Sequence, residues 1–152
     1  MSLGVIFKGP EGIAVAADSI ITLQSVTGQV ITQFFYDNAT KVMSIVGQQF
    51  AGVLTVGLEV LGTDKPRTVG SFIPEFEKTL SKAARMPIKD LASQLGQFFL
   101  LRWKEAALPN NTENIIFYVM GYNEGEAYGR IYKIVIPSTI SAYPVDADTH
   151  QG

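Results

Sequence analysis

The chain has 152 residues and a formal net charge of −2 at pH 7, and 47% of its residues are hydrophobic. This length suits one hydrophobic core of ordinary domain size, and the composition excludes intrinsic disorder, which needs low hydrophobicity or high net charge. The near balance of charges also lacks the broad basic surface of a nucleic-acid binder, so we expect no nucleic-acid partner.

Its lack of cysteine removes several kinds of chemistry. The chain has no cysteine and one histidine, His150, two residues from its end. Disulfides, thiolate zinc sites, a cysteine nucleophile and a multi-histidine metal site are therefore excluded. No apolar run approaches the roughly 20 residues of a membrane span, and the start lacks a signal-peptide pattern. We expect a cytoplasmic protein without a membrane partner, whose base, if it is an enzyme, is a lysine, a carboxylate or a free amine.

The first third of the chain predicts strands. Apolar runs at residues 4–7 and 12–18 are separated by the turn composition Lys-Gly-Pro-Glu and predict a tight β-hairpin. Their apolar residues are consecutive, so we expect both faces of this hairpin to be covered. Residues 24–36, rich in Gln, Thr, Val and Phe, predict a second and more exposed hairpin. Strands at 41–46 and 50–57 follow.

The middle of the chain predicts helices. Apolar residues recur at helical spacing over residues 74–85, with proline in the first turn, and again over 88–107. Two strands, 115–122 and 129–136, then form a hairpin. Residues 138–152 show no clear period, and we expect an irregular tail there.

The order of strands, two helices and strands favours an α+β fold over an alternating βαβ fold. We expect two antiparallel sheets that face each other, with both helices packed together on one outer side. Residues 98–101 and Trp103 form a nearly continuous apolar run, too wide for one face of a core helix. We expect part of this run to be exposed in the single chain and buried between subunits.

Three polar residues stand where chemistry is plausible. Ser2 becomes the first residue if Met1 is removed, Asp18 closes an apolar strand, and Lys41 opens another. A buried carboxylate needs a partner, so we expect an ion pair between Asp18 and Lys41 beneath residue 2. A free α-amine could then take the proton of the hydroxyl, and the ammonium would lower the pKa of that hydroxyl. Taken singly, the three are better explained as a chain terminus, a turn cap and a solvated strand flank.

The segments that hold these residues resemble the β-type subunits of the 20S proteasome and the related bacterial HslV peptidase. Only the ordered combination of segments is specific, because each one is short. The resemblance covers roughly residues 2–137. The matching segments are Gly4-Val-Ile-Phe, Gly12-Ile-Ala-Val-Ala-Ala-Asp-Ser19, Asn38-Ala-Thr-Lys41-Val-Met-Ser-Ile45, Ala51-Gly-Val-Leu-Thr-Val-Gly57, Phe117-Tyr-Val-Met-Gly-Tyr122 and Gly129-Arg-Ile-Tyr-Lys133.

The resemblance implies a single N-terminal-nucleophile hydrolase domain over residues 1–152, folded as a four-layer αββα sandwich of two antiparallel sheets. It implies hydrolysis of peptide bonds in a polypeptide substrate, by a homo-oligomer or a ring with related subunits, without a metal or an organic cofactor. By the same match Ser2 is the nucleophile, Asp18 orients Lys41, Lys41 tunes the nucleophile, and the Gly57 amide receives the oxyanion.

The chain departs from this family in several places. Serine stands where the family has its threonine nucleophile, and Ile20 stands where an arginine is usual. The segment between Asp18 and Lys41 is longer than usual. The family also continues beyond the last hairpin with helices and strands that include a supporting serine, so the chain is expected to be short at its C-terminus. Two alternatives therefore stay open: a non-catalytic ring subunit, and an amidohydrolase of the same fold that cuts a small-molecule amide.

Overall fold

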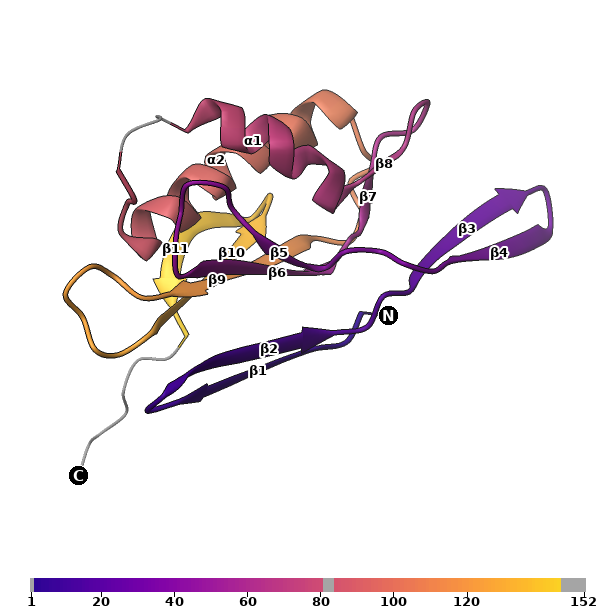
Figure 1. Cartoon of the computed structure of the whole chain (residues 1–152). Coiled ribbons are helices and arrows are strands. Elements are labelled where there is room, and N and C mark those ends of the chain that lie inside the picture. The colour runs from indigo at the N-terminus through magenta and orange to yellow at the C-terminus, as the bar shows by residue number, and fades with distance from the viewer. Residues whose placement is uncertain (1, 81–83, 146–152) are drawn as a thin grey trace.

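The computed structural model describes residues 2–80 and 84–145, except for the side chains of residues 24–26. These residues form a mixed α+β structure with antiparallel sheets, as the order of elements predicted (Figure 1). The elements are β1 (Gly4–Gly9), β2 (Gly12–Ala17), β3 (Ile21–Thr27), β4 (Val30–Tyr36), β5 (Val42–Ser44), β6 (Ala51–Gly57), β7 (Val60–Leu61), β8 (Arg67–Thr68), the 3₁₀ helix η1 (Val69–Phe72), α1 (Ile73–Thr79), α2 (Ile88–Ala106), β9 (Ile115–Gly121), β10 (Arg130–Ile136) and β11 (Thr139–Pro144).

A five-stranded antiparallel sheet forms the centre of the molecule, with strand order β11-β10-β9-β6-β5. Both helices lie on one face of this sheet (Figure 1). Leu91, Leu95 and Phe99 recur at four-residue spacing along α2 and are fully buried, so they form one apolar stripe against the sheet. The Phe99 ring lies 4.7 Å from that of Phe117 on β9, centroid to centroid. The main core is therefore the layer between the helices and this sheet.

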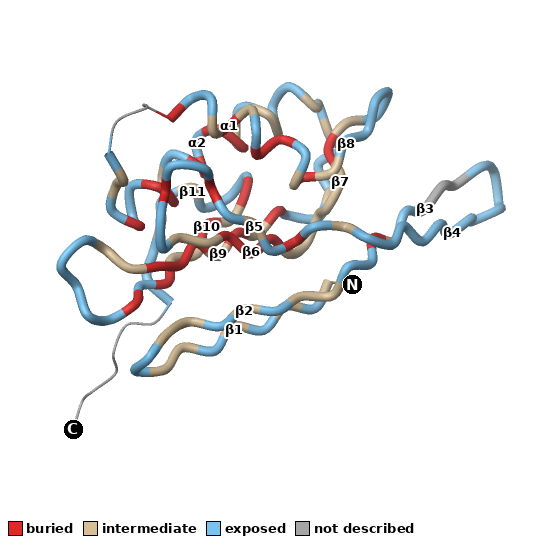
Figure 2. The backbone as a smooth tube through the Cα atoms, viewed as in Figure 1, coloured by how far each residue is buried: buried red, intermediate tan, exposed pale blue. Residues whose placement is uncertain are grey.

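The β1–β2 hairpin covers the opposite face of the central sheet (Figure 1). Its Ile6 and Val15 pack against a second, smaller core that includes Leu54. A Cβ atom on Gly4 would lie 2.9 Å from the Leu54 side chain, so glycine lets β1 approach β6 closely. The expectation that both faces of this hairpin are covered is wrong. Its outer face is open, and the side chain of Phe7 is 70% exposed, because only the inner face has a sheet to pack against (Figure 2).

The β3–β4 hairpin projects away from the rest of the molecule (Figures 1 and 2). It begins at Ile21, three residues before the predicted start, and its two strands pair without interruption from Ile21–Tyr36 to Thr27–Val30. Every residue of β4 is exposed. The predicted exposed hairpin is therefore present.

The layers agree in part with the predicted architecture. Two antiparallel sheets face each other and both helices lie on one outer side, as expected. The described residues make three layers: helices, the central sheet and the β1–β2 hairpin. The four-layer αββα arrangement is thus not shown by this part of the chain.

Two sequence-based boundaries differ from the structure. The first helix ends at Thr79 rather than near residue 85. The tail predicted as irregular over 138–152 contains β11, whose alternating side chains Ile140 and Ala142 pack against the main core; the mixed polar composition of this strand concealed that alternation. The remaining part of that tail, which includes His150, lies outside the described residues.

The apolar run in α2 is buried more completely than predicted. Phe98 and Phe99 are buried, and Leu101 is the one member that is exposed, at 60%. Two elements cover this run. The sheet covers Phe99, and on α1 the ring of Phe76 lies 5.5 Å from the ring of Phe98, centroid to centroid. This run is therefore mostly core, and Leu101 is the part of it that is exposed in the single chain, as expected.

No helix in the described part of the chain is long and apolar enough to cross a bilayer.

Candidate active site

The ion pair predicted between Asp18 and Lys41 is present. Lys41 precedes β5 and is 3% exposed, and its Nζ lies 2.8 Å from Oδ1 of Asp18, which directly follows β2. The same Nζ donates a second hydrogen bond of 2.8 Å to the carbonyl oxygen of Ile20. Lys41 is thus a buried ammonium and not a solvated strand flank.

A second carboxylate, Glu59, completes the surroundings of this ammonium. Glu59 lies between β6 and β7, its side chain is 11% exposed, and its Oε1 is 2.6 Å from Lys41 Nζ. Three oxygens therefore surround a group that has three N–H donors. The sequence analysis missed Glu59, although the signal used for Asp18 was available: a carboxylate stands in the apolar stretch from Val53 to Leu61 and needs a partner there.

Ser2 joins the cluster through Glu59. The Ser2 hydroxyl donates a hydrogen bond to Oε1 of Glu59, the oxygen that also receives Lys41. The neighbouring backbone is tied to Asp18, because the Leu3 N–H donates to Asp18 Oδ1 at 3.1 Å and the Asp18 N–H donates to the Leu3 carbonyl at 3.0 Å. The structure therefore links Ser2, Glu59, Lys41 and Asp18 in one continuous chain of contacts. Met1, whose removal would free the Ser2 amine, lies outside the described residues.

Backbone pairing places these side chains at one end of the sheets. The Thr55 N–H on β6 donates to the Lys41 carbonyl at 2.9 Å, which extends the β5–β6 pairing to Lys41. The Val69 N–H donates to the Glu59 carbonyl at 2.8 Å and fixes the segment that leaves β6. The ends of three strands, β2, β5 and β6, thus supply the carboxylates and the ammonium.

The charges of the cluster set the protonation state of Lys41. Burial lowers the pKa of Lys41, but the hydrogen bonds to Asp18 and Glu59 outweigh this effect and raise that pKa above its ordinary value. The hydrogen bond from Lys41 in turn holds the pKa of Asp18 below its ordinary value, against the opposing effect of burial. Lys41 is therefore an ammonium at neutral pH. It can stabilise negative charge but has no free electron pair with which to accept a proton.

Gly57 lies beside Ser2, as the resemblance implies. Gly57, Ser2 and Glu59 line one cavity of about 110 Å³. Gly57 has a φ of +86°, and a Cβ atom there would lie 2.3 Å from the carbonyl oxygen of Asn114. Only glycine fits this position, so the backbone of residue 57 approaches the cavity without a side chain between.

Ser2 also lines a larger cavity, of about 450 Å³, together with residues of β1 and of the central sheet. The lining of this cavity includes the apolar side chains of Ile6, Leu54 and Ile131. Ser2 thus borders both cavities. Among the described residues, no group of three or more histidine, cysteine, aspartate or glutamate side chains could hold a metal ion.

Comparison of the chain with models of protein families, with curated proteins and with solved structures found no match. What the site does is therefore inferred from its own geometry.

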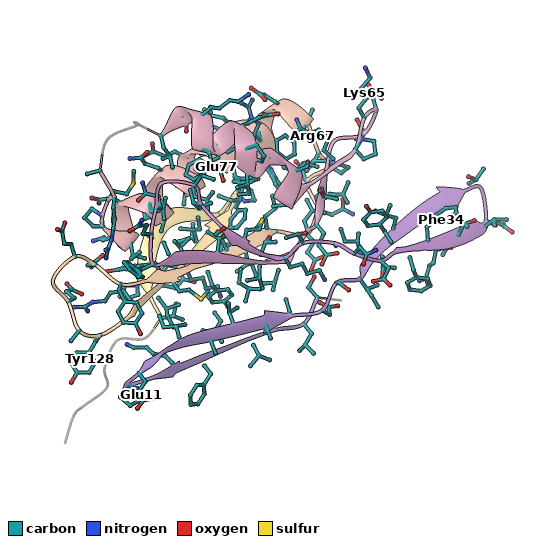
Figure 3. All side chains as sticks on the ribbon, viewed as in Figure 1. Glu11, Phe34, Lys65, Arg67, Glu77 and Tyr128 are labelled. Carbon is teal, nitrogen blue, oxygen red and sulfur yellow. The ribbon has the colours of Figure 1, made fainter. Side chains whose placement is uncertain are left out.

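We expect Lys41→Ala to lower the free energy of unfolding by about 3–5 kcal/mol, because the substitution leaves the largely buried Glu59 and the partly buried Asp18 without their shared cation. Denaturant unfolding measures this loss. Lys65→Ala is the matched control, since Lys65 is exposed at the tip of the β7–β8 loop (Figure 3), and it should change the stability by less than about 0.5 kcal/mol. Equal effects of the two substitutions would contradict the buried cluster.

The stability should also depend on pH through Asp18. Because its folded-state pKa is lowered, the stabilisation from Asp18 is present above the unfolded pKa of about 3.9 and is lost as the pH falls through the folded value. We therefore expect Asp18→Asn to reduce the dependence of unfolding free energy on pH below about pH 4. Urea unfolding at a series of acidic pH values measures it. An unchanged acid slope in this variant would show that the pair does not contribute.

Proposed function

We propose that this chain is a proteasome-like N-terminal-nucleophile hydrolase of the αββα type, an endopeptidase that works within an oligomeric ring. The observation that carries the proposal is the buried Asp18–Lys41 pair, which is joined through Glu59 to the hydroxyl of Ser2. The resemblance requires an ammonium and its orienting carboxylate beneath residue 2, and a chance arrangement of surface residues would not bury them.

The chemistry begins with attack of the Ser2 hydroxyl on a peptide carbonyl. Lys41 stays protonated. It is linked to Ser2 through Glu59, and its positive charge favours the alkoxide that develops on Ser2 Oγ. The backbone at Gly57, which shares a cavity with Ser2, stabilises the oxyanion of the tetrahedral intermediate. The resulting acyl-enzyme is released by water. In the family that the chain resembles, the α-amine of the first residue accepts the proton, which here requires removal of Met1.

The two cavities beside Ser2 support an extended substrate. The apolar cavity of about 450 Å³ can take an apolar side chain, while the smaller cavity lies next to Gly57. A substrate with groups on both sides of the scissile carbonyl would use both. This arrangement favours a peptide over a small amide.

The exposed β3–β4 hairpin is an argument for the proposed oligomer. An isolated two-stranded hairpin is only marginally stable in water, and large exposed apolar patches commonly mark interfaces. Both faces of the β3–β4 hairpin carry apolar side chains that are more than half exposed (Phe34 is labelled in Figure 3). They are Val30, Ile31, Phe34, Phe35 and Tyr36. We therefore place the subunit contact on this hairpin rather than on the apolar run of α2.

We expect the native chain to hydrolyse fluorogenic peptides and to show the mass shift of an acyl adduct on Ser2. Both should be lost in Ser2→Ala. Ser2→Thr, which keeps a hydroxyl, should retain activity. Ser93→Ala, on the exposed side of α2, is the matched control and should leave the rate unchanged. Cleavage of small amides alone would favour the amidohydrolase. A chain that retains Met1, cuts neither class and forms no adduct would favour the non-catalytic subunit.

We expect the native chain to be oligomeric by light scattering, and the combined substitution of Ile31 and Phe35 by serine to lower its mass. These two residues lie on the same face of β4, four positions apart. Leu101→Ser, which also replaces an exposed apolar side chain, should leave the mass unchanged. A native chain that is monomeric at all concentrations would contradict the ring.

A further inference from the structure

We propose that Glu59 is the proton acceptor of the Ser2 hydroxyl, so that attack by Ser2 does not require a free α-amine. This inference rests on the proposed role of Ser2 as nucleophile. Glu59 is a catalytic residue that the resemblance does not supply. With Glu59 as the base, a chain that retains Met1 could also attack a substrate.

The geometry singles out Glu59. A general base must lie within hydrogen-bond reach of the proton it removes, and the Ser2 hydroxyl already donates to Glu59 Oε1. Glu59 is held in place from the other side by Lys41, at 2.6 Å from the same oxygen. Its backbone is fixed as well, because its carbonyl receives the Val69 N–H. The carboxylate is thus positioned before any substrate arrives.

The other groups of the cluster are less suited to this role. Lys41 is an ammonium, and its raised pKa keeps it so at neutral pH. Asp18 Oδ1 accepts hydrogen bonds from the Lys41 ammonium and the Leu3 N–H, so the described contacts of this oxygen are to the lysine and the backbone and not to the Ser2 hydroxyl. The α-amine of Ser2 becomes a base only when Met1 has been removed. Glu59 is the acceptor that the described contacts connect to the nucleophile itself.

The proton transfers balance over one catalytic cycle. As the Ser2 Oγ–carbonyl bond forms, the hydroxyl proton passes to Glu59 Oε1. The protonated Glu59 then gives this proton to the leaving amine as the peptide C–N bond breaks, which leaves an acyl-enzyme. Water attacks the ester, its proton passes to Glu59, and the same proton returns to Ser2 Oγ as the ester bond breaks.

The position of Lys41 predicts how such a base behaves. A carboxylate is a far weaker base than an alkoxide, so transfer of the hydroxyl proton to Glu59 must accompany carbon–oxygen bond formation rather than precede it. The Lys41 ammonium compensates by stabilising the negative charge that develops along the Ser2–Glu59 contact. If a free α-amine were the base instead, the labelling rate would rise with pH near the ordinary pKa of that amine, about 7.7–8.0.

The test uses labelling of Ser2 by a fluorophosphonate, followed by mass spectrometry over a range of pH. Two forms of the full chain are compared, one retaining Met1 and one in which Ser2 is freed by cleavage of an N-terminal fusion. We expect both forms to be labelled at neutral pH. Glu59→Gln should slow labelling of both forms by about 100-fold or more, the usual contribution of a general base. Glu59→Asp, with a shorter carboxylate arm, should be slowed but keep the same pH profile.

Glu124→Gln is the matched control, because it removes one negative charge from an exposed turn, and its labelling rate should equal that of the native chain. Circular dichroism establishes that each variant is folded. If Glu59→Gln does not fold, the native chain still decides the question through its two forms. Labelling of the Met1-free form alone, rising near pH 8, would overturn the role of Glu59 and leave the proposed function intact. Labelling that Glu59→Gln does not slow would also overturn it, and no labelling of Ser2 in either form would overturn the proposed function itself.

Discussion

The burial of one ammonium group organises this end of the molecule. Lys41 is almost inaccessible to solvent, and an unpaired buried charge would be strongly destabilising. The fold therefore has to bring Asp18 and the Ile20 carbonyl, from one segment, and Glu59, from a segment distant in sequence, to the Lys41 ammonium. This requirement ties the end of β2 and the start of β5 to the end of β6. Ser2 is held at the same point because its hydroxyl and the next amide both bind carboxylates of this cluster.

The two faces of the central sheet divide structural and chemical roles. The face that carries α1 and α2 is a dense core of aromatic and aliphatic side chains. The other face has a thinner cover, since the β1–β2 hairpin contributes one row of side chains such as Ile6 and Val15. Ser2 lies at the end of this thinner layer, where the apolar cavity remains between β1 and the sheet. A rigid core on one face can thus hold an accessible cavity on the other.

The sequence predicted local patterns well and long-range environment poorly. The hairpins and the second helix follow from alternation, turn residues and helical spacing, which are local properties. The Asp18–Lys41 pair was also predictable, because Asp18 closes one apolar strand and Lys41 opens another, so each needs a partner. Glu59 follows by the same logic, because it too stands in an apolar stretch. What could not be predicted was burial: Phe7 and Phe98 occupy equally apolar stretches, yet one faces solvent and the other lies beneath α1. That difference depends on which elements become neighbours.

The charge of the cluster connects the assignment of the base to the chemistry of the chain's first residues. One ammonium and two carboxylates leave the cluster with a net charge of −1, which is unusual for a site that must stabilise a developing anion. If Met1 is removed, the α-ammonium of Ser2 brings this sum to zero, and the same negative field favours its protonated form, which cannot act as a base. If Met1 is retained, Glu59 is still the acceptor that the described contacts connect to the Ser2 hydroxyl. The second carboxylate thus weakens the amine as a base, so the two routes to an active Ser2 oppose each other electrostatically.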